Sequence, residues 1–291
     1  MPRDLTARPL EPTATATATA PAAARLARVV EDLPRRLLPE RLEALRGAVL
    51  VRAHHEGRDL EPVVLLLDAG VRTVPGADAA GPDVVLRCEL DALEALTTGI
   101  TSAGLLLLGG RLEVEGDLDL ALGLAGSFRS AADPQVAVEP VALEASEVAR
   151  VLGTVPVAHL VRIMGSDLRG VVLEEIFRQL PERLSLRRAR GTRLCVGFRL
   201  LGHPAGVIER YEVLVAEGRA VVTRLDDAAA RHDGTDGAGR DATVTCQAHD
   251  FLRLATGHLR PVTAVMRGQL KVRGDRGHAL RLASLIDIPQ A

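Results

Sequence analysis

Apolar residues in the second half of the chain change from a helical to a strand spacing. Steps of three and four residues join Leu168, Val172, Ile176, Phe177 and Leu180. This spacing places them on one face of a helix, and Pro181 ends it because proline lacks an amide hydrogen. Over 193–200 apolar and polar residues then alternate, as in a strand with one buried face. A helix followed by successive strands is an α+β pattern and not a βαβ series.

The chain contains an internal repeat. Residues 83–124 align without a gap with residues 241–282, which lie 158 positions further along. The identical pairs include Asp83 and Asp241, Cys88 and Cys246, Gly99 and Gly257, Gly110 and Gly268, Gly116 and Gly274, and Asp117 and Asp275. Each copy is predicted to contain a helix broken at Leu-Pro, three short strands, a fourth strand, helical turns, a fifth strand and a closing helix.

The repeat divides the sequence into four segments. Residues 1–24 are rich in Ala, Thr and Pro, with few large apolar residues, and are expected to form a disordered tail. The first domain is expected over 25–130 and the second over 166–291. Between them, 131–165 is predicted to be a helical linker, with helices interrupted by Gly and Pro.

Acidic residues are predicted to cap several helices. Asp117 and Asp275 precede the closing helices, where their carboxylates can accept backbone N–H bonds. Asp167 stands before the helix of the second repeat in the same way. Asp91 followed by Glu94 has the spacing of a capping box.

Composition narrows the classes of partner and location. Basic and acidic residues are interspersed, the formal net charge is -2, and this argues against a nucleic-acid partner. No run of about 18 apolar residues is present, so no integral membrane contact is expected. The N-terminus lacks the apolar core of a signal peptide, and Cys88, Cys195 and Cys246 are interpreted as reduced core residues. A cytoplasmic protein is therefore expected, and the preference for Arg and Ala suggests a bacterial genome.

The second repeat carries a pattern that resembles the sterol carrier protein type 2 family. A short helix ending in TG is followed by an apolar turn, the strand motif GQLKVRGD and a closing helix, all within 254–285. The first repeat is looser, because 104-GLLLLGG-110 replaces the usual small and polar turn. The resemblance implies two domains, each with a five-stranded, mainly antiparallel sheet covered by helices on one face. It also implies a tunnel for fatty acyl chains, acyl-CoA or sterols, with no catalytic residue, metal or cofactor.

The apolar positions of the second repeat supply a candidate lining for such a tunnel. The predicted lipid-binding residues are Ile176, Phe177, Leu180, Leu194, Val196, Phe198, Phe251, Leu254, Val262, Val265 and Met266. Aromatic residues make up only 2 % of the chain, so aliphatic ligands are favoured over stacked bases. The same residues would point inward in a filled core, and the sequence leaves both interpretations open.

Other residues do not form a recognisable catalytic or metal site. The eight histidines are scattered, and the adjacent His54 and His55 cannot aim at one ion from a strand. No GxSxG or Cys-His pattern presents a nucleophile. His249, His258 and His278 are interpreted as helix-surface residues, with contact to a ligand head group as the alternative.

Two further segments also allow two interpretations. The basic stretch 186–193 is interpreted as a solvated face, with binding of acidic lipid head groups or CoA phosphates as the alternative. The run 105-LLLL-108 is interpreted as core, with an exposed docking patch as the alternative.

The leading hypothesis is non-enzymatic intracellular binding or transfer of a hydrophobic small-molecule ligand, such as a fatty acid, acyl-CoA, sterol or isoprenoid-like lipid. The alternative hypothesis is a structural or accessory partner of a lipid-modifying or biosynthetic enzyme, with no open pocket. An appended catalytic function is disfavoured, because nothing outside the two repeats is long enough to form a separate catalytic domain.

Overall fold

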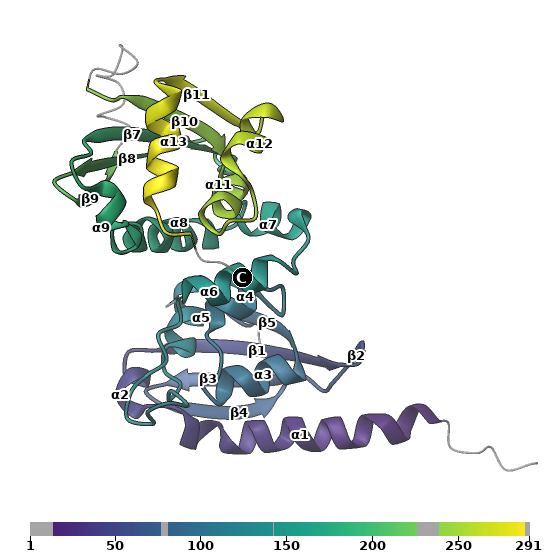
Figure 1. Cartoon of the computed structure of the whole chain (residues 1–291). Helices are drawn as coiled ribbons and strands as arrows, with labels where there is room; N and C mark the ends of the chain where they lie inside the picture. Colours follow the sequence, from purple (N-terminus) through teal and green to yellow (C-terminus); the bar gives the residue numbers. More distant parts are fainter. Residues whose placement is uncertain (1–13, 77–80, 142, 226–238, 289–291) are drawn as a thin grey trace, which may run out of the picture. The chain divides into compact units, whose positions relative to one another are not determined.

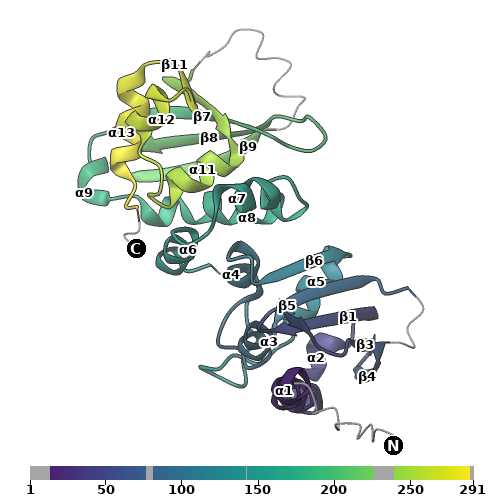
Figure 2. The same ribbon diagram turned by 90° about the vertical axis from the view of Figure 1, so that its right-hand side faces the viewer.

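The computed structural model describes residues 14–76, 81–141, 143–225 and 239–288. The chain divides into two compact units (Figures 1 and 2). Unit 1 comprises residues 1–103 and 111–140, and unit 2 comprises residues 104–110 and 141–291. Unit 2 therefore includes a short segment from the first sequence repeat.

The sheet of unit 1 has the strand order β4-β3-β1-β5-β6. Its strands are β1 (Arg46–His55), β3 (Val63–Asp68), β4 (Val71–Pro75), β5 (Val84–Glu89) and β6 (Leu112–Gly116), and β2 (Arg58–Asp59) pairs with the end of β1. The pair β1 and β5 is parallel and the other pairs are antiparallel. The helices of this unit are α1 (Ala14–Arg36), α2 (Pro39–Leu42), α3 (Leu90–Thr97) and α5 (Leu118–Ala125).

The sheet of unit 2 repeats this arrangement in the order β11-β10-β7-β8-β9. Its strands are β7 (Leu194–Leu201), β8 (Glu209–Ala216), β9 (Arg219–Leu225), β10 (Ala242–Gln247) and β11 (Leu270–Gly274). Only β7 and β10 pair in parallel. The prediction of two α+β domains with mainly antiparallel sheets is confirmed.

Helices α11 and α13 of unit 2 lie against one side of its sheet, as Figure 1 shows. The helices of this unit are α4 (Ala103–Leu108), α6 (Ala145–Leu152), α7 (Val157–Ile163), α8 (Leu168–Gln179), η2 (Pro181–Arg183), α9 (Leu186–Ala189), α11 (Ala248–Ala255), α12 (Pro261–Met266) and α13 (Arg276–Leu285). The two helices α6 and α7 occupy part of the expected linker, and they are separated near Gly153 and Pro156 as its sequence indicates.

Two of the repeated residues, an aspartate and a glycine, build the same junction in each sheet. The Asp83 carboxylate accepts from the Ala48 amide at 2.8 Å, and the Asp241 carboxylate accepts from the Cys195 amide at 2.6 Å. Gly274 has a φ of 80°, and a Cβ there would stand 2.5 Å from the Asp241 carbonyl oxygen. Glycine is required because both the left-handed backbone and the close approach exclude a side chain.

Helix α4 shows that the repeats are not structurally equivalent. All four leucines of 105–108 are buried, so the interpretation of this run as core is confirmed. Leu105 and Leu108 belong to the hydrophobic cluster of unit 2, and His159 of α7 hydrogen-bonds the Leu107 carbonyl at 3.2 Å. The corresponding helix of the second repeat, α12, instead exposes Met266. A segment of the first repeat thus completes the core of unit 2.

The predicted helix caps are confirmed at two positions and wrong at two others. The Asp117 and Asp275 carboxylates accept backbone N–H bonds at the starts of α5 and α13. Asp167 makes no capping bond, because its backbone already has helical angles and not the extended ones of a capping residue. Asp91 and Glu94 form no capping box either.

Asp91 and Glu94 bind Arg25 of helix α1 instead. The Arg25 guanidinium donates to Asp91 at 2.7 Å and to Glu94 at 2.9 Å. A guanidinium offers several charge-assisted hydrogen bonds, which outcompete the weaker capping interaction. These ion pairs attach α1 to α3.

The prediction of a disordered tail is wrong for residues 14–24, which belong to helix α1. The helix begins at Ala14, and Ala22 is buried. Alanine has the highest helix propensity, so an Ala-rich segment continues a helix that Leu26 and Leu33 anchor through burial. Residues 1–13 of the predicted tail lie outside the described residues.

The cysteines are free and buried in both units. Burial raises the pKa of Cys88 and of Cys246 to about 12, and that of Cys195 to about 11. The folded state therefore favours the neutral thiol. The stabilisation that accompanies this preference is present below the unfolded thiol pKa of about 8.5 and is lost as pH rises toward the folded values.

Alkylation of the thiols is expected to require opening of the fold. A pKa rise of about three units leaves roughly a thousandfold less thiolate at pH 8 in Cys88 and Cys246. Iodoacetamide labelling followed by peptide mass spectrometry, with and without urea, measures the difference. Native rates equal to those of the unfolded chain would contradict the buried environment.

Candidate functional site

Unit 2 contains a cavity of about 260 Å³ between its sheet and its helices. We call it the second-repeat cavity. Its lining comprises Ile176, Leu180, Arg183, Val196, Phe198, Val244, Phe251, Leu254, Ala255, Pro261, Val262, Val265, Met266, Leu270, Val272, Arg276, Ala279, Leu280, Leu282, Ala283, Ile286 and Ile288. All of these residues are apolar except two arginines. Such a lining suits an aliphatic guest and offers no carboxylate, imidazole, thiol or hydroxyl group.

Nine of the eleven predicted site residues line this cavity. They are Ile176, Leu180, Val196, Phe198, Phe251, Leu254, Val262, Val265 and Met266. Phe177 and Leu194 do not line it, although both are buried. Leu194 pairs with Val215 of β8 within the sheet and is 1 % exposed, so its side chain belongs to the filled part of the core.

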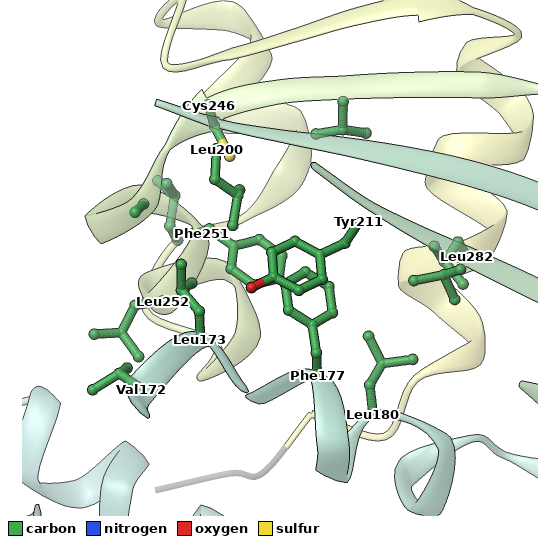
Figure 3. Packing of buried hydrophobic residues seen from close by; sticks show 14 of the residues in the cluster. Val172, Leu173, Phe177, Leu180, Leu200, Tyr211, Cys246, Phe251, Leu252 and Leu282 are labelled. Carbon is green, nitrogen blue, oxygen red and sulfur yellow. The ribbon is translucent and has the colours of Figure 1, made fainter. Parts of the chain in front are cut away.

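Phe177 is withdrawn from the cavity by stacking. Its ring centroid lies 3.8 Å from that of Tyr211 and 4.9 Å from that of Phe251, both in nearly parallel orientation (Figure 3). Phe198 meets Phe177 and Phe251 edge-on at 5.9 and 5.4 Å. Phe198 and Phe251 also line the cavity, so this aromatic cluster forms one wall and fixes its shape.

The closing helix α13 supplies a wall that the sequence-based prediction did not include. Ala279, Leu282, Ala283 and Ile286 come from this helix or its end, and Leu270 and Val272 come from β11. The signals were present in the sequence. The GQLKVRGD strand has Leu and Val at alternate positions, and the closing helix has apolar residues three and four apart.

Helix α12 and the outer side of α13 form the mouth of the cavity. Met266 is 83 % exposed, Val262 is 57 % exposed and Leu280 is 46 % exposed, yet all three also line the cavity. A side chain that touches both the cavity and the solvent marks an opening. The cavity is therefore open to solvent between these two helices.

The two arginines lie toward opposite ends of α13. Arg276 is the first residue of the helix. Arg183 lies beside its last turn, because the Asp287 amide donates to the Arg183 carbonyl at 2.8 Å and Leu184 pairs with Ile286. A ten-residue helix is about 15 Å long. The cavity is thus an apolar space with a cation near each end.

Arg183 has a half-buried guanidinium that donates to the Gln179 side-chain oxygen. Burial lowers the pKa of Arg183. The negative charges of Glu144, Glu175 and Glu182 raise this pKa, but burial has the larger effect. Glu175 and Glu182 both form ion pairs with Arg178. Among the described residues, Arg183 has no carboxylate within ion-pair distance.

His249, His258 and His278 do not line the cavity. His258 hydrogen-bonds the Ala149 carbonyl at 2.6 Å, and His278 lies 3.2 Å from the Asp275 carboxylate. Burial lowers the pKa of His249.

In the basic stretch 186–193, Arg188 pairs with Asp287. Within the described ranges, no group of three or more potential metal ligands is assembled.

Unit 1 has a charged groove between two of its helices, α1 and α3. The groove has a volume of about 620 Å³ and is lined by charged residues such as Arg28, Asp32 and Glu94. This groove is larger than the second-repeat cavity, but its charged lining does not suit an apolar ligand. The apolar cavity described above lies in the second repeat.

Comparison with known proteins agrees with this architecture. The model of the SCP-2 sterol transfer family matches residues 29–129 and again residues 189–287. The α+β fold and the apolar cavity define a domain of the carrier type. The chain belongs to the SCP-2 sterol transfer family and carries two copies of its domain, so the resemblance seen in the sequence is confirmed. Lipid binding or transfer is the function that such domains imply.

Individual relatives cover only parts of the chain. Hydroxysteroid dehydrogenase-like protein 2 of Xenopus tropicalis is 37 % identical over 46 residues, which are 16 % of this chain and 11 % of that protein. Sterol carrier protein 2 like 2 of Aedes aegypti is 22 % identical, with a TM-score of 0.28, over 35 % of this chain and 94 % of that chain.

Two further structures are similar over comparable lengths. Sterol carrier protein 2 of Yarrowia lipolytica in its apo form is 20 % identical, with a TM-score of 0.28, over 38 % of this chain and 91 % of that chain. The sec-alkylsulfatase Pisa1 of Pseudomonas sp. is 18 % identical, with a TM-score of 0.34, over 42 % of this chain and 17 % of that chain. In the part of the chain that the structure describes, no helix is long and apolar enough to cross a membrane.

Proposed function

We propose that the second repeat binds one aliphatic chain of an amphiphile with an acidic head group, and carries it without chemical change. The observation that supports this function is the lining of the second-repeat cavity, which is apolar except for Arg183 and Arg276. Burial of each methylene group contributes roughly 0.8 kcal/mol, so a long chain gains affinity without polar contacts along its length. The absence of any acid, base or nucleophile among the lining residues favours a carrier over an enzyme.

Arg183 is the proposed anchor for the head group. A guanidinium that is half buried beside apolar residues is costly unless an anion accompanies it. Of the carboxylates that act on it, Glu175 and Glu182 are paired with Arg178, and Glu144 is not within ion-pair distance, which leaves the positive charge available to a ligand. A carboxylate or phosphate can accept two parallel hydrogen bonds from a guanidinium. This selects acidic amphiphiles, such as fatty acids, over neutral sterols.

The first repeat is proposed to have a structural role. Its helix α4 belongs to the core of unit 2, and the groove of unit 1 is charged. The proposed ligand would therefore bind once per chain. A cytoplasmic location is part of the same proposal, supported by three buried cysteines that are free thiols.

The head group assignment predicts a preference for dodecanoate over dodecanol in the wild-type protein. The acid is expected to bind about tenfold tighter or more, because the charged hydrogen bond is made only with the acid. In Arg183→Met this preference is expected to vanish while dodecanol affinity stays unchanged. Competitive displacement of a fluorescent fatty acid measures both affinities.

The matched control is Arg187→Met, since Arg187 is an exposed arginine nearby that does not line the cavity. It should retain the preference for the acid. Equal binding of acid and alcohol to the wild-type protein would refute the head group assignment alone. Failure of both ligands to bind would refute the cavity as a lipid site.

A further inference from the structure

The last strand of each sheet, β6 in unit 1 and β11 in unit 2, lies at an edge. Among the described residues, β6 pairs only with β5, and β11 pairs only with β10. The outer side of an edge strand presents backbone N–H and C=O groups with which another strand can pair. Each of these two strands is therefore a place where a further strand can be added.

The two edge strands have the same apolar positions and opposite charges. Their sequences are 112-LEVEG-116 and 270-LKVRG-274. Leu270 and Val272 line the second-repeat cavity, so the charged residues that alternate with them point to the other face of the sheet. The charged residues of both strands, Glu113, Glu115, Lys271 and Arg273, are exposed.

The neighbouring strands do not cancel this difference in charge. On the same face of the sheet, β5 contributes Arg87 and Glu89, and β10 contributes the uncharged Thr245 and Gln247 at the aligned positions. The Glu115 carboxylate lies 3.4 Å from the Arg87 guanidinium, yet the Glu115 side chain remains 60 % exposed. This margin of the sheet is therefore acidic in the first repeat and basic in the second.

An antiparallel pair of β6 from one copy of the chain and β11 from another copy brings opposite charges together. With the two central valines opposite each other, Glu113 stands opposite Arg273 and Glu115 stands opposite Lys271. Residues directly opposite point to the same face, and opposite charges there stabilise the pair. The register of β6 on β5 is repeated by β11 on β10, so the backbone hydrogen-bonding positions of the two edges also match.

Pairing between two like edges is disfavoured. Two copies of β6 would set glutamates opposite glutamates, and two copies of β11 would set cations opposite cations. Charged residues on edge strands usually prevent association between copies of a protein. Here the charges oppose both like pairings and favour the mixed one, which gives the edges specificity.

We propose that the chain associates with a second copy of itself by pairing β6 of one copy with β11 of the other, which joins two sheets into one. Each chain carries one acidic and one basic edge. Association therefore closes as a dimer with two such contacts or continues head to tail. The four charged side chains do not line the second-repeat cavity, so this interaction does not depend on the proposed ligand.

Sedimentation velocity tests the pairing with two charge-reversed variants. The acidic-edge variant, Lys271→Glu with Arg273→Glu, has acidic residues on both edges, and the basic-edge variant, Glu113→Lys with Glu115→Arg, has basic residues on both. The wild-type sedimentation coefficient is expected to rise with protein concentration in low salt, and less in high salt because ions screen exposed charges. Each variant alone is expected to associate at least about thirtyfold more weakly.

Mixing the two variants in equal amounts is expected to restore association. Every contact in the mixture can then join an acidic edge to a basic edge. This recovery would also show that both variants are folded. The matched control, Arg72→Glu with Arg219→Glu, reverses two exposed arginines on the other edge strands, β4 and β9, and should associate like the wild-type protein.

Four results would overturn the proposal. A wild-type chain that stays monomeric at every concentration in low salt has no such contact. Single variants that associate as strongly as the wild-type protein would place the contact on another surface. A mixture that stays monomeric would exclude pairing by complementary charge, and equal weakening in the control variant would show that only net charge matters.

Discussion

Replacing Arg169 by methionine is expected to destabilise unit 2 by about 3–5 kcal/mol. Arg169 is 2 % exposed and its Nε donates to Glu209 at 2.6 Å. The same guanidinium donates to the Met164 carbonyl at 2.9 Å and the Leu201 carbonyl at 3.2 Å. These bonds connect helix α8 to the end of β7 and to β8. Removal of the arginine leaves the Glu209 carboxylate buried without its partner.

Urea unfolding followed by tyrosine fluorescence measures this loss in one unit. Tyr211 is the only tyrosine and the chain has no tryptophan, so the signal comes from unit 2 alone. Arg178→Met, which removes an exposed arginine from the same helix together with its ion pair to Glu175, should have a much smaller effect. Arg169→Met with Glu209→Met should recover much of the stability, since both buried charges are removed. A double variant as unstable as the single one would contradict this account.

Replacing Leu108 by alanine is expected to destabilise unit 2 by about 2–5 kcal/mol, although Leu108 belongs to the first sequence repeat. Leu108 is 1 % exposed and lies in the same cluster as Val148 and Leu252. Deleting its side chain leaves a void in that cluster. The tyrosine transition should move to lower urea concentration. Leu186→Ala, at a leucine of α9 that is 70 % exposed, should leave the transition nearly unchanged.

The cysteines distinguish which unit the Leu108 variant opens. Cys246 lies in unit 2 and Cys88 lies in unit 1, and both are buried thiols. Pulsed alkylation of the Leu108→Ala variant in intermediate urea should label Cys246 earlier than in the wild-type protein, with a smaller change at Cys88. Selective exposure of Cys88 would show that α4 belongs to the first unit.

The sequence predicted local features of the fold well where the cause is local. Period-two and period-3.6 patterns located the strands and helices, and the repeated Asp, Gly and Cys residues revealed two equivalent sheets. The caps at Asp117 and Asp275 are also local, since each carboxylate reaches amides two or three residues away. These interactions depend on neighbouring residues only.

The remaining features depend on contacts between distant residues. Nothing near Asp91 and Glu94 in sequence indicates Arg25, which lies more than 60 positions away. Arg169 and Glu209 are 40 positions apart, so no local pattern in the sequence indicates that they form a buried ion pair. The 105-LLLL-108 run looks apolar in either unit, and only the tertiary structure assigns it to unit 2.

The candidate site shows the same division. Alternation and helical spacing identified which residues point inward, and nine of those chosen line the cavity. These patterns do not distinguish a residue that lines a cavity from one that packs in a filled core. Phe177 and Leu194 do not line the cavity, because the Phe177 ring stacks on other rings and Leu194 packs within the sheet. Shape depends on how side chains from several elements meet, which sequence spacing does not contain.

One aliphatic ligand is proposed to occupy the second-repeat cavity. Native mass spectrometry of a variant whose cavity is filled by a larger side chain tests this most directly. Ala283 of α13 lines the cavity, whereas the neighbouring Ser284 is exposed. After incubation with dodecanoate, the wild-type protein and Ser284→Phe are expected to carry one ligand per chain, and Ala283→Phe none. Equal loading of Ala283→Phe and the wild-type protein would contradict the account, since the guest would then bind elsewhere.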